Sequence, residues 1–193
     1  FITIACNKNK AYVGEQVVVN YTLYSRYANL ETSNYEMPAL DGFWADNVDI
    51  GEPKWEDKLQ QVNGLQYRVA EIKKQVLIPQ RAGKLRIAPF SMQCIVNRSI
   101  FSRGSAFDVK SNAVEVTVAS LPAGAPASFQ GAVGELDMTV KVDRTTVKAN
   151  EAIQLTVTYG GRGNLKLVEA PARNFPSDFE SYDPKVTDKI AVN

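Results

Sequence analysis

A pair of strand-like stretches occurs twice in the sequence, and this repeat limits the fold more than any other feature. Residues 1–24 align with residues 137–160 without a gap, at a constant offset of 136. Within each copy, apolar residues alternate with polar ones, which is typical of strands with one buried face. The apolar positions of the first stretch are Ile2, Ile4 and Cys6 in one copy and Met138, Val140 and Val142 in the other.

The remainder of the first copy continues with short strands. Asn63-Gly64 is a strong signal for a two-residue hairpin turn, because both residues tolerate a positive φ. The stretch Leu65–Ile78 is predicted to be one long strand, and its alternation slips between Val69 and Ile72, which indicates a β-bulge. Valines alternate with polar residues over Val114–Val118, and this pattern predicts the last strand.

Proline, glycine and charged residues mark further turns. Pro79 and Gly83 bracket one turn, and Pro89 either interrupts a strand or moves it to the edge of a sheet, because proline lacks the N–H that a sheet uses. Arg98–Arg103 is expected to be a hairpin tip rather than an anion site. The segment 55–62 fits either a strand or a short helix. About seven short strands within one domain, separated by such turns, predict a β-sandwich.

These patterns predict an all-β protein with tandem immunoglobulin-like β-sandwich domains, the second of them truncated. Residues 1–120 are expected to form the first domain. Residues 121–128, rich in Pro, Ala and Gly, are expected to be a linker. Residues 129–193 are expected to be the N-terminal part of the second domain, whose half-sandwich would leave its inner face uncovered.

Charge and the absence of histidine exclude several classes of function. The 193 residues include 22 Lys and Arg against 21 Asp and Glu, so no basic surplus supports nucleic-acid binding. Without histidine, the sequence cannot form a Ser-His-Asp or Cys-His catalytic site or a His-ligated metal site. No run of about 20 apolar residues predicts a membrane span. We expect no catalytic activity, no cofactor and no metal.

Two cysteines lie on the apolar side of their strand patterns. Cys6 follows Ile4 at a spacing of two, and Cys94 follows Met92 in the same way. Two interpretations are open. The cysteines are either buried thiols that behave as small hydrophobic residues, or they form a disulfide, which requires Cα atoms within about 7 Å.

Two polar segments have compositions that resemble ligand sites. Gly160–Asn164 is glycine-rich, but a phosphate loop needs a following helix, and a strand-like segment, Leu165–Val168, follows instead. We predict a structural turn there. The second segment is expected to be a solvated acidic loop, because it lacks the residue order of a calcium loop. Its carboxylates are Asp41, Asp46, Asp49 and Glu52.

Aromatic residues gather in or beside the longest irregular stretch. They are Tyr35, Phe43, Trp44 and Trp55. Most of them are expected to cap the core, and Trp44 is the best candidate for an exposed position. Because tryptophan dominates binding hot spots, we predict that Trp44, with Phe43 beside it, contacts a partner.

Three stretches add a more specific pattern. They are Val62-Asn63-Gly64 with Pro79-x-x-x-Gly83-x-x-x-Ile87-x-Pro89; Phe129-x-Gly131-x-Val133-Gly134; and Gly161-x-Gly163-Asn164-Leu165 with Pro171 and Tyr182-Asp183-Pro184-Lys185. Together they resemble the BatD family, the aerotolerance-operon proteins of bacteria. The resemblance covers most of the chain.

The resemblance implies an exported protein with an N-terminal signal, periplasmic β-domains and a C-terminal helix in the inner membrane, outside this chain. It also implies an operon shared with proteins that contain von Willebrand A-type and tetratricopeptide-repeat domains, which are the expected partners. The family has no established catalytic residues.

Three functions follow as hypotheses. The first is a non-catalytic scaffold that docks proteins through strand edges and loops. The second is a carbohydrate- or surface-binding module, which would need Trp44 and Trp55 on one exposed surface. The third is an enzyme, which would need a deep pocket with paired carboxylates.

Overall fold

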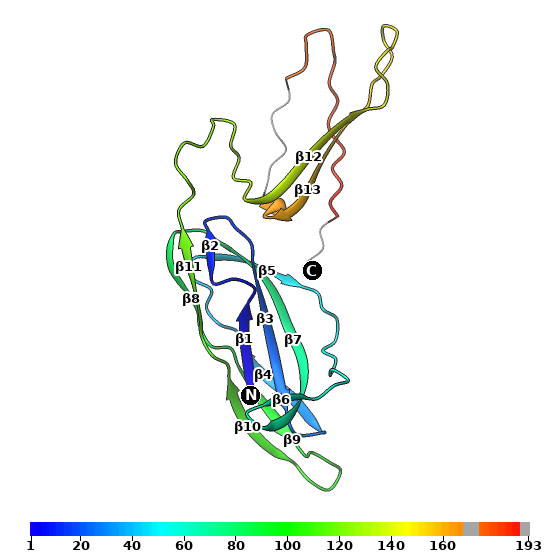
Figure 1. Ribbon diagram of the computed structural model, residues 1–193. Helices are drawn as coiled ribbons and strands as arrows, with labels where there is room; N and C mark the ends of the chain where they lie inside the picture. Colours follow the sequence, from blue (N-terminus) through cyan, green and yellow to red (C-terminus); the bar gives the residue numbers. More distant parts are fainter. Residues whose placement is uncertain (168–173, 190–193) are drawn as a thin grey trace. The chain divides into compact units, whose positions relative to one another are not determined.

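The computed structural model describes residues 1–167 and 174–189, and this part of the chain contains strands and one short 3-10 helix (Figure 1). The all-β prediction is thus confirmed. The chain divides into two compact units, Phe1–Leu121 and Pro122–Asn193. None of the described helical segments has the length and hydrophobicity of a membrane span.

The first unit is built entirely from strands and their connections. The strands are β1 (Ile2–Cys6), β2 (Lys10–Tyr12), β3 (Val17–Ser25), β4 (Leu30–Glu36), β5 (Phe43–Val48), β6 (Gln60–Val62), β7 (Leu65–Pro79), β8 (Gly83–Ile87), β9 (Ser91–Val96), β10 (Ser105–Lys110) and β11 (Val114–Ala119).

One layer of this unit is an antiparallel sheet in the order β1-β3-β7-β5, with β6 paired to the start of β7. β6 and β7 form the predicted hairpin, in which Val62 pairs with Leu65. Asn63 and Gly64 take φ values of 49° and 79°, as a two-residue turn of this hand requires. Segment 55–62, which fitted either a strand or a short helix, therefore ends in the short strand β6.

The predicted bulge in β7 is also present. Tyr21 of β3 pairs with Lys73, and the next residue, Thr22, pairs with Glu71. Ile72 is left without a partner, so the slip in apolar alternation corresponds to one extra residue in the strand.

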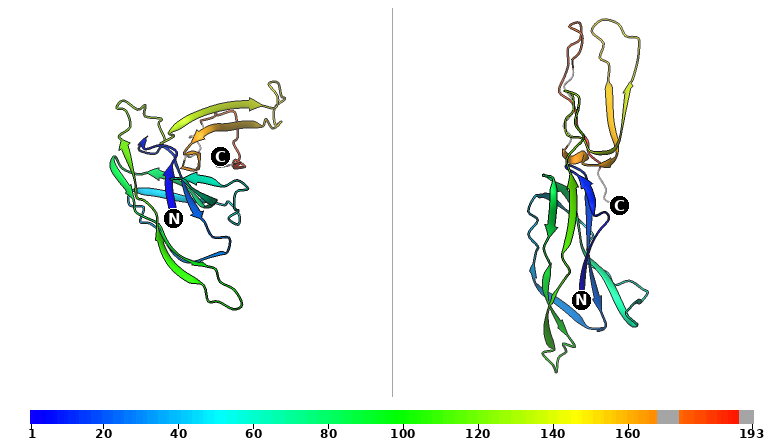
Figure 2. Two further views of the ribbon diagram at one scale, coloured as in Figure 1. Left: turned by 60° about the horizontal axis from the view of Figure 1, so that its bottom comes forward. Right: turned by 60° about the vertical axis from the view of Figure 1, so that its left-hand side comes forward.

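The second layer is a long hairpin with a break in each arm (Figure 2). β8 pairs with β11, and β9 pairs with β10, while residues 88–90 and 111–113 interrupt the two arms. Pro89 lies in the first break, as predicted. β4 extends the sheet beside β9, and β2 extends it beside β11 in a parallel sense. The tip expected at Arg98–Arg103 joins β9 to β10.

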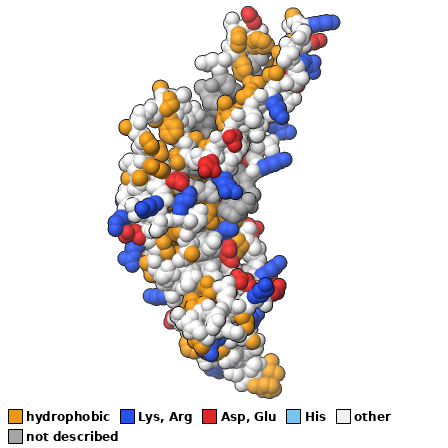
Figure 3. All heavy atoms as spheres, viewed as in Figure 1, with side chains coloured by type: hydrophobic (Ala, Val, Ile, Leu, Met, Phe, Trp, Pro, Cys, Tyr) orange, Lys and Arg blue, Asp and Glu red, His pale blue; other side chains and the backbone are white. Residues whose placement is uncertain are grey.

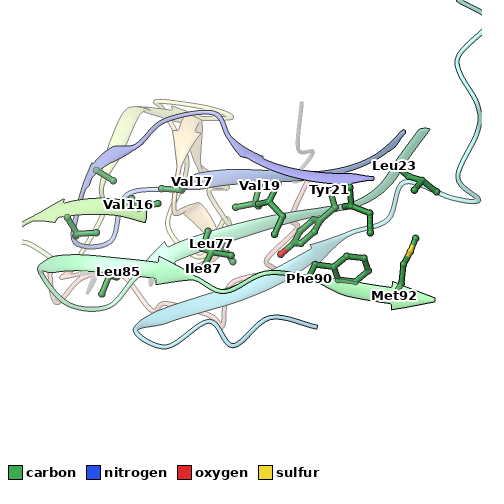
Figure 4. Packing of buried hydrophobic residues seen from close by; sticks show 14 of the residues in the cluster. Val17, Val19, Tyr21, Leu23, Leu77, Leu85, Ile87, Phe90, Met92 and Val116 are labelled. Carbon is green, nitrogen blue, oxygen red and sulfur yellow. The ribbon is translucent and has the colours of Figure 1, made fainter. Parts of the chain in front are cut away.

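Apolar side chains of the two layers meet in one core (Figure 4). Val17, Val19 and Tyr21 of β3 are fully buried. The Tyr21 ring meets Phe90 of the second layer edge-on, with centroids 5.6 Å apart. Each large side chain buried in this way stabilises the fold by about 1.5–3 kcal/mol. The core also includes Leu23, Leu77, Leu85, Ile87, Met92 and Val116.

A chain of polar side chains runs from this core to the exposed Asn47 of β5 and joins three neighbouring strands. The Tyr21 hydroxyl donates to Gln75 Oε1 at 2.7 Å, and Gln75 Nε2 donates to Asn47 Oδ1 at 3.0 Å. Burial raises the pKa of Tyr21 to about 12, so its hydroxyl keeps the proton that it donates. The buried amide of Gln75 is thereby satisfied from both sides.

The second unit contains β12 (Gly134–Val142), β13 (Leu155–Gly163) and the 3-10 helix η1 (Leu165–Leu167). β12 and β13 form an antiparallel hairpin in which Met138 pairs with Tyr159. In the first unit Ile2 pairs with Leu23, which is the same pairing displaced by 136 residues. The register agrees at all five pairs of β1, so the sequence repeat is a structural repeat.

Some local predictions were wrong. Gly160–Asn164 is no turn, because the first four of these residues belong to β13. The following segment, Leu165–Val168, was expected to be a strand. Its first three residues form η1, and Val168 lies outside the described residues. β4, β5 and β10 were not predicted as strands. Since all three are edge strands with many exposed residues, they lack the alternation that marks a half-buried strand.

Candidate functional site

The two predicted contact residues lie at the start of β5, the edge strand of the first layer. Phe43 is half-buried and packs against the core, whereas Trp44 is 36% exposed and takes no part in that packing. Neighbouring residues of a strand point to opposite faces, so Trp44 lies on the sheet face away from the core. The register agrees, since Trp44 pairs with Ile78, and Leu77, the residue before Ile78 in β7, belongs to the core.

β5 is the last strand of the first layer. Its residues from Phe43 to Val48 pair with β7, and none of the described strands pairs with its outer edge. An open edge offers unpaired N–H and C=O groups to another strand. The segment expected to be an acidic loop is therefore partly strand, with Asp46 inside β5.

The other aromatic residues divide differently from the prediction. Trp55 is half-buried, packs against the core and lies under the Arg68 guanidinium at 4.6 Å. Tyr35 was expected in the core, but it is 59% exposed because β4 is an edge strand of the second layer. Since Trp55 packs toward the core and Trp44 does not, the two tryptophans do not form one stacking surface for a sugar.

The two cysteines are free thiols. Cys94 is buried in the core, and Cys6 is half-buried against it. This agrees with the interpretation of both cysteines as buried thiols and not with a disulfide. Burial raises the pKa of Cys6 to about 11 and also raises that of Cys94. Because the thiolate is the reactive form, both thiols are poor nucleophiles at neutral pH.

A shallow surface cavity of about 210 Å³ lies where the second layer breaks. Glu36, Pro89 and Lys110 contribute to its lining, and the Ser91 hydroxyl donates to Glu36 Oε2 at 2.8 Å. Pockets for small-molecule ligands usually measure about 300–1,000 Å³, so this cavity is small for such a ligand. No group of three or more Cys, Asp and Glu side chains within residues 1–167 and 174–189 could hold a metal ion.

The glycine-rich motifs of the second unit meet each other at the open end of the β12–β13 hairpin, away from the loop that joins the two strands. Gly134 pairs with Gly163, and Asn164 is buried beside them. Asn164 Oδ1 accepts from the Val133 amide at 2.9 Å, and its Nδ2 donates to Gly131 O at 2.8 Å. The asparagine therefore ties the segment before β12 to the end of β13.

A comparison with known protein families matches most of the chain. The family model described as the BatD DUF11-like domain matches residues 4–118 and 140–193, which is most of the chain. The chain belongs to the BatD family. No curated protein and no solved structure matches it significantly, so the immunoglobulin-like assignment of the sandwiches rests on the sequence pattern alone.

The motifs that resembled BatD are explained by backbone geometry. A Cβ on Gly134, Gly161 or Gly163 would lie within 2.5 Å of a backbone carbonyl oxygen of the segment that faces it. Only glycine permits so close an approach. In the first unit, Asn63-Gly64 forms the β6–β7 turn, while Pro79 and Gly83 bound the turn from β7 to β8. Pro171 of the last motif lies outside the described residues. These glycine and turn residues of the motifs thus have roles in the backbone structure.

Proposed function

We propose that this BatD-family chain is a non-catalytic scaffold module that docks partner proteins through the edges and loops of its β layers. The observation that supports this most directly is the outer edge of β5, with which none of the described strands pairs, beside the 36% exposed ring of Trp44. Main-chain hydrogen bonds at such an edge give affinity, and side chains beside it give specificity.

The edge of β5 is placed by the core rather than by loops. Phe43 packs inward, and Asn47 belongs to the polar chain through Gln75, so two residues of β5 are anchored on either side of Asp46. A rigid, partly exposed tryptophan loses little conformational entropy when a partner buries it, which is why such residues become hot spots. The partner best suited to this edge is a protein that adds an extended strand.

Family membership suggests the compartment and the partners. We place the module in the periplasm, held to the inner membrane by a segment outside the residues 1–193. The proposed partners are the von Willebrand A-type and tetratricopeptide-repeat products of the same operon. The balanced charge, 22 basic against 21 acidic side chains, fits a protein partner better than nucleic acid.

Binding of the chain to each purified operon product, measured by calorimetry at micromolar concentration, tests this proposal. Trp44→Ala should weaken the interaction by about 2 kcal/mol or more, which is a loss of roughly 30-fold. Tyr35→Ala is the matched control, because Tyr35 is an exposed aromatic on an edge strand of the other layer. No association with any operon product would contradict the scaffold role. Association that Trp44→Ala leaves unchanged would exclude the β5 edge.

A further inference from the structure

The tip of the β9–β10 hairpin exposes two large apolar side chains. Ile100 is 91% exposed and Phe101 is 93% exposed, more than any other large hydrophobic residue that the structure describes. In Figure 3 hydrophobic atoms gather at the lower end of the molecule, where Figure 1 draws the end of this hairpin. The core and the other strands gain no buried area from either side chain.

The backbone of this tip is held by a dense set of local hydrogen bonds. The Ser99 amide donates to Ser102 O at 2.9 Å, and the Ser102 amide donates back to Ser99 O at 3.2 Å. The hydroxyl oxygens of the same serines accept from the amides of Phe101 and Gly104 at 3.3 and 3.2 Å. The two apolar side chains therefore project from a defined turn.

The base of the turn is equally specific. Asn97 and Gly104 take positive φ values of 55° and 73°. A Cβ on Gly104 would lie 2.5 Å from Val96 O, so glycine is needed where the two arms come together. Neither Ile100 nor Phe101, the two central residues, takes a positive φ, so the turn accepts most residue types there. Neither side chain belongs to the core, so the fold does not need large apolar residues at these two positions.

The charged residues within the tip itself are both cations. Arg98 and Arg103 flank the apolar pair, and residues 97–104 contain no Asp or Glu. Arg98 also meets Glu31 of β4 at 3.0 Å, in a pair whose side chains are both more than half exposed. An exposed pair of this kind is weak and leaves the arginine free to exchange partners. The tip thus presents an apolar point between two cations.

We propose that this tip inserts into the interfacial region of an anionic lipid bilayer, with Ile100 and Phe101 entering the acyl boundary and the arginines meeting lipid phosphates. Two such side chains bury roughly 300–400 Å², far below the 1,200 Å² or more of a specific protein interface. A bilayer requires no shape complementarity, and a convex apolar point flanked by cations matches its layered chemistry. This inference goes beyond the proposed docking of proteins.

Membrane contact through two side chains is weak and reversible, as it is for a single lipid anchor. On a protein already held at a membrane, a second weak contact in the first unit would fix how the β layers face the bilayer. The outer edge of β5 would then be presented in one orientation rather than in many.

Flotation of the full chain with vesicles tests the proposal. Vesicles of equal parts phosphatidylcholine and phosphatidylglycerol should bind the chain, vesicles of phosphatidylcholine alone should bind it less, and high salt should reduce the difference. The double variant Ile100→Ser with Phe101→Ser should lower partitioning by at least about 10-fold, because it removes both inserted side chains. The tip contributes nothing to the core, so this variant should fold normally.

Two controls separate the tip from other apolar surfaces. Leu59→Ser changes a 55% exposed side chain elsewhere in the first unit, and Val140→Ser changes a 54% exposed side chain in the second; neither should alter partitioning. Phe101→Trp should give a fluorescence signal that brominated lipid quenches. The proposal is overturned if the unaltered chain does not bind anionic vesicles, or if the tip variant binds as well as it does. Loss of binding to a purified operon product in the tip variant, with vesicle binding unchanged, would assign the tip to a protein pocket instead.

Discussion

The β1–β3 and β12–β13 hairpins have one backbone design in two different surroundings. Their strand registers coincide after a displacement of 136 residues. Ile4 of the first hairpin is 3% exposed, whereas Val140, at the matching position of the second, is 54% exposed. The whole apolar face shows the same contrast, since none of the described residues buries Met138, Val140, Val142, Leu155, Val157 and Tyr159.

The agreement between the hairpins extends to the hydrogen bonds that close them. In the first, the Val18 amide donates to Asn7 Oδ1 at 2.9 Å. In the second, the Gln154 amide donates to Asp143 Oδ1 at the same distance. The Tyr12 amide likewise donates to Glu15 Oε2, as the Lys148 amide does to Glu151. Each residue named in the second hairpin lies 136 positions after its counterpart in the first.

This contrast separates what a hairpin determines from what its surroundings determine. Pairing register and loop geometry persist in both copies, so local side chains and backbone bonds are sufficient for them. Burial differs because it depends on a second layer, which in the first unit is formed by β8, β9 and β11. One short strand depends on that layer too. β2 pairs with β11, and residues 146–148, which match it, are not a strand.

The largest test of this difference is truncation at matched positions. Ile4→Ala should destabilise the first unit by about 2–5 kcal/mol, because it opens a cavity between two layers. Val140→Ala should change the stability of the second unit by no more than about 0.5 kcal/mol, since its side chain is exposed. Urea unfolding combined with hydrogen exchange of each unit measures both. Equal losses would show that a covering layer protects the second hairpin in solution.

A second test addresses the close approach of β12 and β13. Gly161 has a φ of 122°, and a Cβ there would lie 2.1 Å from Glu135 O. Gly161→Ala should therefore destabilise the hairpin by about 1–3 kcal/mol. Gly160→Ala is the matched control, because nothing lies within 4 Å of its added Cβ. Hydrogen exchange of the β12 amides is the measurement, and similar effects of the two substitutions would reject the steric explanation.

The smallest expected effect is a dependence on pH that distinguishes Asp143 of the second hairpin from Asn7, the matching residue of the first. The hydrogen bond from the Gln154 amide lowers the pKa of Asp143 below its usual value of 3.8. The stabilisation of the hairpin by this hydrogen bond is therefore complete above pH 3.8. It is lost as pH falls through the lowered pKa that Asp143 has in the folded state. The Gln154 amide should lose protection over this range, and Asp143→Asn should abolish the dependence.

Asn7 provides the internal comparison, because an amide does not titrate. Protection of the Val18 amide from hydrogen exchange should therefore not depend on a titration of residue 7. The nearby carboxylate of Glu15 also has a lowered pKa. Burial alone would raise the pKa of Glu15, but hydrogen bonds from Lys8 and the Tyr12 amide outweigh it. NMR measurement of both amides in one sample gives the two profiles, and identical profiles would contradict the assignment to Asp143.

Much of the strand order could be predicted from local patterns. The repeat identified both hairpins, Asn63-Gly64 located a turn, and the slip before Ile72 located a bulge, because each of these depends on neighbouring residues. Edge strands escaped prediction because their exposed residues show no alternation. The glycines around Gly161 were misread as a turn, since their need for small size arises from the facing strand.

The candidate surfaces were harder to predict than the strands. Trp44 was expected to be exposed, and it is, but the open edge beside it depends on β5 pairing with β7, some 30 residues later in the chain. The prediction that Trp44 and Phe43 contact a partner stays a prediction. Arg98–Arg103 was correctly expected to be a tip, yet nothing in its sequence indicated that Ile100 and Phe101 would both point into solvent.

The polar chain from Tyr21 through Gln75 to Asn47 has a consequence on the opposite side of the sheet. Sliding β5 by two residues along β7 would keep every side chain on its own face, so packing alone discriminates poorly against such a slip. It would, however, set Ala45 or Asp49 where Asn47 now accepts from Gln75, and Ala45 would leave the Gln75 amide without this side-chain acceptor. This part-buried hydrogen bond thereby favours the alignment of β5 that holds the Trp44 ring at the edge of the sheet.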